Sequence, residues 1–183
     1  SIFPTQRSRR TLYAYRVRGQ PDPFLELFNQ PNPNDSCEER VAESVTPQAF
    51  SLLNSDLMND RAIALALRAE KEFEDLHMQV KRVVQLAFGR VPEKKEWDRL
   101  EKYVRKMRGY HLENKPQKPV YPTSITRSLV EEATGLPFEY KEILPAFQNY
   151  HADKKAHEVS ARTRALADLC LVLFNANEFM YVY

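Results

Sequence analysis

Glycine and cysteine are scarce in this sequence, which has 4 glycines and 2 cysteines among 183 residues. So few glycines argue against a glycine-rich phosphate loop and against a barrel built from tight hairpins. The GxGxxG, GxxxxGK[ST], HExxH and GxSxG motifs are absent, and the four histidines do not have metal-ligand spacing. We therefore predict no catalytic, cofactor-binding or metal site within this chain.

Long apolar runs and a strong net charge are also lacking. No stretch of about 18 apolar residues exists, so no membrane span is predicted. The formal net charge is +2, which gives no global field for nucleic-acid binding. Residues 1–18 contain five arginines and no acid, whereas residues 19–45 contain six acids and one arginine. We predict an extended basic and acidic arm over 1–45, either solvated on both faces or folded back on itself or on a partner.

The two cysteines, Cys37 and Cys170, form no CxxC or CxxCH motif, so no haem attachment is predicted in this chain. Cys170 lies on an apolar helical stripe, and the simplest interpretation is a buried free thiol. A Cys37–Cys170 disulfide is the alternative. It would need an oxidising compartment and would close a long loop, which is worth about 4 kcal/mol or more in the chain-entropy model.

Proline is frequent, with 12 residues that fall mostly outside the apolar periodic stretches. This pattern predicts a mainly α fold, an irregular multi-helix domain with long proline-rich loops and one or two short β-hairpins. Residues 46–110 are predicted to be helices. Thr46 and Pro47 begin the first, Gly89 ends another, and Pro92 and Gly109 begin and end a third.

The remaining segments have weaker patterns. Residues 8–18 are predicted to be a strand or extended arm, and Phe24 to Phe28 a short helical turn. Residues 111–157 form a proline-rich connector with a hairpin around "TGLP". Residues 158–183 form the terminal helix and a packed tail.

Two short stretches resemble each other, "FSLLNSDLM" (50–58) and "LVLFNANEFM" (171–180). In each, an asparagine is expected to tie or re-cap a helix end, at Asn54 and at Asn175. The tail after Asn175, with Phe179, is then expected to pack on the core as a short extended segment. Deletion of that tail would remove several buried apolar side chains.

Four stretches together resemble a known family. They are "RRTLYAYRVRGQPDPFLELFNQPNPNDSC", "SVTPQAFSLLNSDLM", "LAFGRVPEKKEWDRL" and "LCLVLFNANEFMYVY". They are similar to the C-terminal domain of unknown function in large secreted planctomycete proteins, the planctomycete cytochrome-associated family. The resemblance covers most of the chain and is weakest over 111–157.

The resemblance implies that the chain is a single domain or the second half of a larger one. It implies export to the periplasm or cell surface. The expected partners are an upstream half of the same protein and a c-type cytochrome domain that carries haem c. No catalytic residues carry over from the family.

Two hypotheses of different classes follow. The first is a non-catalytic helical scaffold or interaction domain of an exported cytochrome-linked protein. The alternative is a part of a haem-dependent redox enzyme, acting on carbohydrate or another extracellular substrate, whose cleft this piece shapes. A weaker third idea is a glycan-binding surface made by loop tyrosines, with Tyr110, Tyr121, Tyr140 and Tyr150 as candidates.

Overall fold

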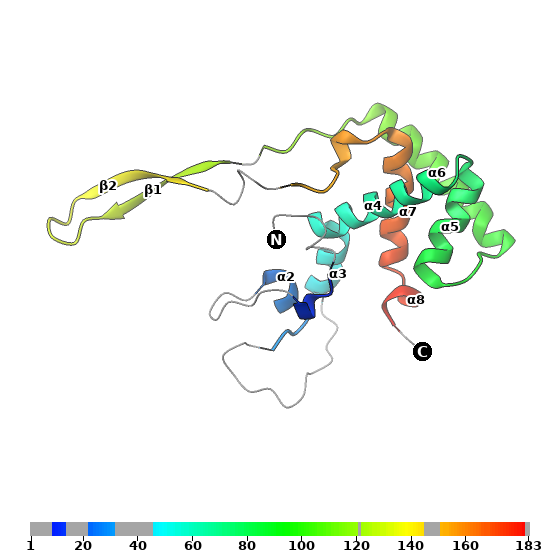
Figure 1. Cartoon of the computed structure of the whole chain (residues 1–183), viewed down its shortest axis with the longest axis horizontal. Helices are drawn as coiled ribbons and strands as arrows, with labels where there is room; N and C mark the ends of the chain where they lie inside the picture. The colour runs from blue at the N-terminus through cyan, green and yellow to red at the C-terminus, as the bar shows by residue number, and fades with distance from the viewer. Residues whose placement is uncertain (1–8, 14–21, 32–45, 121, 145–150, 182–183) are drawn as a thin grey trace. The chain divides into compact units, whose positions relative to one another are not determined.

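The protein is mainly α-helical, with one antiparallel hairpin among the residues described by this computed structural model (Figure 1). These residues are 9–13, 22–31, 46–120, 122–144 and 151–181. The mainly α fold class with a short hairpin is confirmed. The chain divides into two compact units, residues 15–116 with 154–183 and residues 1–14 with 117–153.

The first of these, the helical unit, contains most of the regular structure. Its elements are α2 (Pro23–Glu26), α3 (Thr46–Asn54), α4 (Asp56–Glu72), α5 (Leu76–Phe88), α6 (Lys94–Glu113), the 3₁₀ turn η3 (Ala156–Glu158), α7 (Ala161–Phe174) and α8 (Asn177–Met180). The second, the hairpin unit, contains the 3₁₀ turn η1 (Thr11–Tyr13) and the strands β1 (Ser124–Val130) and β2 (Pro137–Ile143).

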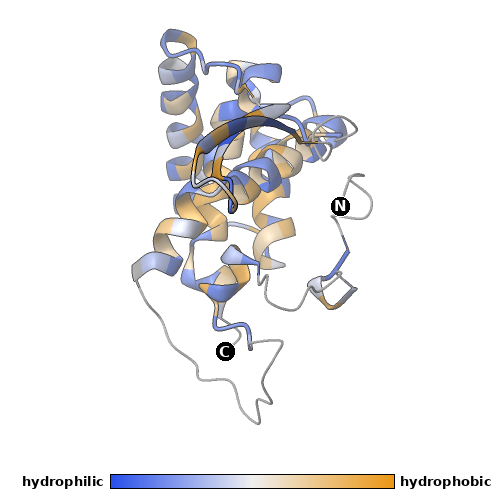
Figure 2. Cartoon of the chain, turned by 90° about the vertical axis from the view of Figure 1, so that its left-hand side faces the viewer, coloured by the Kyte–Doolittle hydropathy of each residue, from blue (hydrophilic) through white to orange (hydrophobic). Residues whose placement is uncertain are grey.

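Helix α7 is the centre of the helical unit. It packs most extensively against α4 and α6, and also contacts α5, α3 and α8. Hydrophobic residues lie mainly where these helices face one another (Figure 2). The buried side chains that form the core include Ile63, Ala66, Val80, Val83, Val84, Val104, Leu166, Leu169, Cys170 and Leu173. The apolar stripe predicted along the last helix is therefore the one that is buried.

Side-chain caps fix where three of the helices begin. Ser55 accepts a hydrogen bond from the backbone N–H of Met58, and Ser160 accepts one from Thr163. Asp75 caps α5 in the same way. Each cap provides a partner for an N–H group that has none within the helix. Gly89 ends α5 with φ 73°, in the left-handed region that glycine adopts without steric cost.

The ends of α6 differ from the prediction. Glu93, not Pro92, takes the cap position, and its backbone N–H donates to the Glu96 carboxylate at 3.2 Å. Pro92 is buried one residue earlier. Gly109 does not end the helix, because α6 continues to Glu113 and closes at Asn114. One glycine in a helix interior costs about 1 kcal/mol, which packing on α7 overcomes.

Three further predictions need correction. The described part of 8–18 forms a 3₁₀ turn at Thr11–Tyr13 in place of a strand. The predicted connector begins later than residue 111. The tail forms one helical turn, Asn177–Met180, where an extended segment was expected. Phe179 remains 42% exposed, although its ring lies 5.1 Å from that of Phe174. The tail is therefore only partly packed.

The hairpin predicted around "TGLP" is present. Its strands pair antiparallel from Ser124 opposite Ile143 to Val130 opposite Pro137. In the connecting turn, Gly135 has φ 70° and its N–H donates to the Glu131 carbonyl at 2.8 Å. Glycine suits this position because a side chain would be strained there.

Candidate interaction surface

The hairpin has one apolar face. Residues directly opposite each other in an antiparallel pair lie on the same face. The pairs Leu129–Phe138, Arg127–Tyr140 and Ile125–Glu142 therefore share one side. We call this side the apolar face of the hairpin and define it by Ile125, Leu129, Phe138 and Tyr140. The opposite side is mainly polar, since its central pairs are Ser128–Glu139 and Thr126–Lys141.

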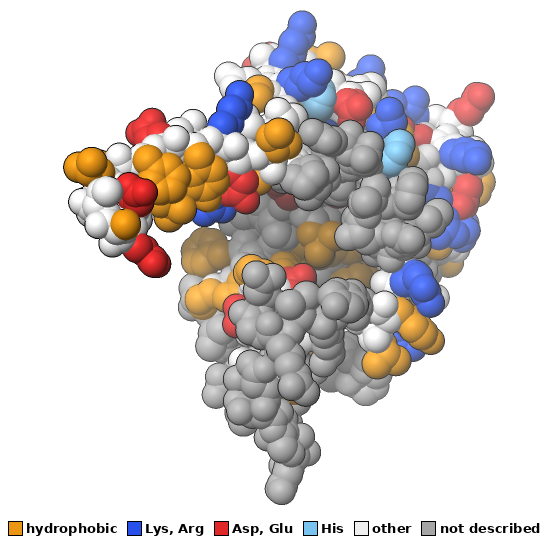
Figure 3. All heavy atoms as spheres, turned by 60° about the vertical axis from the view of Figure 1, so that its left-hand side comes forward, with side chains coloured by type: hydrophobic (Ala, Val, Ile, Leu, Met, Phe, Trp, Pro, Cys, Tyr) orange, Lys and Arg blue, Asp and Glu red, His pale blue; other side chains and the backbone are white. Residues whose placement is uncertain are grey.

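The apolar face is open to solvent. Leu129 is 50% exposed and Phe138 is 47% exposed. Figure 3 shows hydrophobic side chains gathered on this hairpin, with acidic side chains around them. The rings of Phe138 and Tyr140 lie side by side, with centroids 6.1 Å apart. An exposed apolar cluster with a charged rim is typical of a protein interaction site.

The described contacts that hold the hairpin together are local. Arg127 donates to the Glu142 carboxylate across the strands. Glu131 N–H donates to the Leu136 carbonyl at 2.9 Å beside the turn. A hairpin of two strands is marginally stable at best in water unless a further strand or another element packs on it. The chemistry of this element therefore favours binding to a partner.

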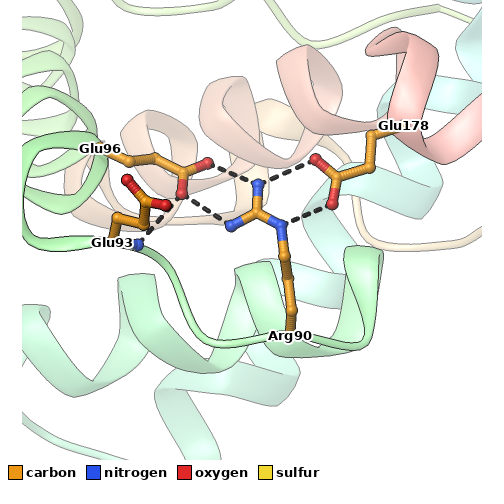
Figure 4. A network of polar contacts seen from close by, with 4 residues as sticks. All are labelled: Arg90, Glu93, Glu96 and Glu178. Atoms are coloured by element: carbon orange, nitrogen blue, oxygen red, sulfur yellow. Dashed lines mark hydrogen bonds and ion pairs between the residues drawn. The ribbon is translucent and has the colours of Figure 1, made fainter.

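A second feature of the chain is an arginine clamp in the helical unit (Figure 4). Arg90 follows Gly89 in the loop between α5 and α6. Its guanidinium donates to both carboxylate oxygens of Glu96, at 2.8 and 3.0 Å. It also donates to both oxygens of Glu178, at 2.6 and 2.8 Å. Bidentate contacts of this kind combine charge with a fixed planar geometry.

The clamp changes the acid–base properties of its members. Hydrogen bonds from Arg90 hold the pKa of Glu96 and of Glu178 below the usual range for glutamate. Hydrogen bonds to Glu178 and then Glu96 raise the pKa of Arg90 further above its already high value. All three side chains stay charged at neutral pH. The clamp is therefore a structural tie between the start of α6 and α8, with no group poised to exchange a proton.

A histidine–carboxylate pair joins α6 to α7. His111 Nε2 lies 2.7 Å from Asp168 Oδ2, and the His111 side chain is 15% exposed. The described part of the chain places no serine, threonine or cysteine within hydrogen-bond distance of His111. A second contact of His111 is structural, because Arg164 donates to its backbone carbonyl at 2.9 Å. Among the described residues, the pair therefore joins two helices without a neighbouring side-chain nucleophile.

Polar contacts also hold the segment before α7. Lys155 Nζ lies 2.8 Å from both carboxylate oxygens of Asp60, and both side chains are largely buried. Arg164 donates to the backbone carbonyls of Ala156 and Val159 at 3.2 and 2.8 Å. These contacts fix η3 against α4 and α7.

The two asparagines of the resembling stretches lie in similar positions. Asn54 donates its side-chain amide to the Phe50 carbonyl at 3.0 Å, and Asn175 donates to Leu171 at 2.8 Å. Each side-chain amide thus binds the backbone carbonyl four residues earlier, at the end of its own helix. A new helix begins two residues after each asparagine. Asn175 also lies 3.5 Å from the Leu52 carbonyl and so reaches α3.

The remaining predicted structural residues are spread over several elements. Helix α3 begins at Thr46, with Pro47 in its first turn, where proline's missing N–H removes no helical hydrogen bond. Cys170 is a free, fully buried thiol on α7, and Cys37 lies outside the described residues. Cys170 is thus a free thiol in the core of the helical unit. The alternative pairing with Cys37 stays a prediction, because Cys37 is outside the described part of the chain.

The two candidate glycan-binding tyrosines that are described belong to different units of the chain. Tyr110 is 55% exposed on α6, and Tyr140 is 38% exposed on β2. Tyr121 and Tyr150 lie outside the described residues. Across the described ranges, no three histidine, cysteine, aspartate or glutamate side chains are placed to share a metal ion.

Sequence reasoning missed the arginine clamp and the apolar face. The apolar face had a local signal, since "FEYKEI" alternates apolar and polar residues over part of its length. The clamp had no local sequence signal, because Arg90 and Glu178 are brought together only by tertiary structure. In the part of the chain with described structure, no helix has the length and apolar content needed to cross a membrane.

The described residues therefore form a helical unit and a hairpin unit with an exposed apolar face. We identify no catalytic arrangement of side chains among them. A family model described as "PSD1: Protein of unknown function (DUF1553)" matches residues 4–104. Because the match covers more than half of the sequence, the chain belongs to this family. The match ends within α6, before the hairpin and α7. No curated protein and no solved structure matches the chain.

Proposed function

We propose that this chain is a non-catalytic helical scaffold and interaction domain of an exported, cytochrome-linked multidomain protein. In this role the helical unit is the stable scaffold, and the apolar face of the hairpin binds another part of the same protein. The proposed partners are an upstream half of that protein and a c-type cytochrome domain.

The single observation that carries the proposal is the exposure of the apolar face. Leu129, Phe138 and Tyr140 lie together, exposed to solvent, on a sheet that has two strands among the described residues. Burial of one such side chain contributes about 1.5–3 kcal/mol. A partner surface that covers these residues would therefore stabilise the hairpin, and the same buried side chains would contribute to the affinity of the complex.

The finer identification rests on the resemblance of four stretches to the planctomycete cytochrome-associated proteins. Membership of the DUF1553 family agrees with a domain of unknown function but leaves the cytochrome link and the export as proposals. The haem c belongs to the proposed partner domain, since this chain has no CxxCH motif.

The first test is purification of the protein from its native source, with a visible absorption spectrum and N-terminal mapping of every co-purifying chain. We expect a Soret band, and this chain continuous with or tightly bound to a CxxCH-bearing chain in an exported fraction. Absence of haem from the purified assembly would overturn the cytochrome link.

The second test measures amide hydrogen exchange over residues 124–143 in the isolated chain and in the native full-length protein. We expect slower exchange in the full-length protein and loss of that protection in a Leu129→Ser/Phe138→Ser variant. Thr126→Ala, on the polar face, is the matched control and should retain protection. Equal exchange rates in the isolated chain and the native protein would contradict binding through the apolar face.

A further inference from the structure

Strand β2 has an open edge with a defined set of backbone groups. The sheet contains two strands among the described residues, so the side of β2 away from β1 has no strand partner there. Leu144 N–H donates to Thr123 O at 2.8 Å, and Glu131 N–H donates to Leu136 O at 2.9 Å. Both residue pairs follow the register of the strands. Together they determine which of the opposing residue pairs along the ladder are hydrogen-bonded.

Hydrogen-bonded and non-hydrogen-bonded pairs alternate along an antiparallel ladder. Even-numbered residues of β2 therefore direct their backbone groups to β1. Glu139, Lys141 and Ile143 direct their N–H and C=O groups to the open edge. Pro137 directs only a carbonyl there, because proline has no N–H. The open edge can accept one further strand.

The charges on this edge select a register for pairing with a second copy. When two β2 strands run antiparallel around a two-fold axis at Tyr140, Glu139 faces Lys141 of the second copy, and Lys141 faces its Glu139. Both pairs join opposite charges. An axis at residue 139 would oppose two glutamates, and an axis at residue 141 would oppose two lysines, which is unfavourable. An axis at Glu142 also opposes two glutamates.

The same register agrees with the backbone. It places Glu139 and Lys141 in hydrogen-bonded pairs through the N–H and C=O groups that the open edge provides. Tyr140 then faces Tyr140 of the second copy in a non-hydrogen-bonded pair, where side chains approach most closely. Because Phe138 and Tyr140 are already neighbours, the pairing extends their aromatic cluster across the axis.

We propose that β2 pairs antiparallel with β2 of a second copy of this chain, around a two-fold axis at Tyr140, to form a four-stranded sheet. A closed two-fold contact uses the same patch on both subunits and ends the assembly at two chains. Four strands give the hairpin the support that two strands lack. Pro137 and the two charges disfavour other strands and other registers at this edge.

This proposal builds on the interaction role of the hairpin but uses its edge, whereas the proposed function uses its apolar face. The two can therefore fail separately. A chain that dimerises through β2 without any haem-bearing partner would keep the pairing and remove the cytochrome link. A haem-bearing assembly with a single copy of this chain would keep the cytochrome link and remove the pairing through β2.

The test is a charge-swap series measured on the full chain by sedimentation equilibrium. We expect a concentration-dependent dimer for the original sequence. Glu139→Lys alone and Lys141→Glu alone each place like charges opposite one another twice, so dimerisation should weaken by about tenfold. The double variant Glu139→Lys/Lys141→Glu restores opposite charges and should restore the dimer.

A cysteine cross-link tests the axis directly. In a Cys37→Ser background, Tyr140→Cys should form an intermolecular disulfide on mild oxidation, because the paired positions fall within the Cα separation that a disulfide spans. Thr126→Cys, on β1, is the control and should cross-link far less. A chain that is monomeric throughout, a double swap that fails to restore dimerisation, or equal cross-linking at both positions would overturn the proposal.

Discussion

Arg90 and Glu178 are 88 residues apart in sequence, yet two guanidinium nitrogens of Arg90 donate to the two carboxylate oxygens of Glu178, at 2.6 and 2.8 Å. The same guanidinium also binds Glu96 near the start of α6. One side chain in the α5–α6 loop thus ties α8 to α6. Polar contacts contribute to the attachment of α8 alongside the Phe174–Phe179 ring contact.

Arg90→Ala is expected to lower the melting temperature by a few degrees and to loosen α8. The substitution removes four charge-assisted hydrogen bonds and leaves two neighbouring carboxylates without their shared cation. The effect stays modest because Arg90 is 40% exposed and water screens the pair with Glu178. Calorimetry measures the shift, and hydrogen exchange reports on residues 177–181.

The matched control for this experiment is Arg105→Ala. Arg105 pairs with Glu101 on the same helix, four residues away. Such exposed pairs contribute about 0.3–0.5 kcal/mol, so the melting temperature should barely change. An equal loss in the two variants would contradict the clamp as a tie between separate elements.

The pH dependence of stability should also reflect the clamp. Hydrogen bonds from Arg90 lower the pKa of Glu96 and Glu178 in the folded state. The stability that these carboxylates contribute is therefore present above the glutamate pKa of the unfolded chain, about 4.3. It is lost as the pH falls through their lower folded-state pKa values. The free energy of unfolding should decrease with acidification below about pH 4.3.

Urea unfolding at a series of pH values from neutral to acidic measures this dependence. Arg90→Ala should make the decrease shallower, because the two carboxyl groups then titrate closer to their usual range. Glu72 and Glu101 also have pKa values lowered by arginines, so part of the decrease remains in the variant. An unchanged pH profile would show that the clamp does not couple to folding.

Two glycines of the helical unit should respond to alanine in opposite directions. Gly109 lies in the interior of α6, and a Cβ added there would meet open space. Gly109→Ala should stabilise the protein by about 0.5–1 kcal/mol. Gly89 has φ 73°, so Gly89→Ala should destabilise by about 1 kcal/mol even though space is open there as well.

Chemical denaturation of both glycine variants decides between two interpretations of Gly109. If this residue ended a helix in the left-handed conformation, Gly109→Ala would destabilise the protein as Gly89→Ala does. Stabilisation at Gly109 together with destabilisation at Gly89 agrees with a helix that continues to Glu113.

The sequence allowed the helices and the hairpin to be predicted because their signals are local. Pro47 in the first turn of α3 and Gly89 at the end of α5 act on backbone groups a few residues away, and apolar periodicity defines the buried face of α7. Gly109 was misassigned because the same residue type can end a helix or be tolerated within one. The choice depends on packing between α6 and α7, which no local pattern encodes.

The candidate surface was harder to predict than the fold. A hairpin could be expected around "TGLP", but strand register decides which side chains share a face. That register became visible only with the pairing of Leu129 with Phe138. The partners of Arg90 depend in the same way on tertiary structure. Sequence reasoning therefore reached the element that carries the candidate surface without reaching its chemistry.

Cys170 should be chemically silent in the folded protein. Its side chain is fully buried on α7 in the core, and burial raises the pKa of its thiol well above the usual range. Because the thiolate is the reactive form, a thiol reagent at neutral pH should modify Cys170 only when the helical unit opens. The measurement uses a Cys37→Ser variant, so that Cys170 is the sole thiol. Its labelling rate should rise with urea in step with unfolding, whereas rapid labelling in native buffer would contradict a buried thiol.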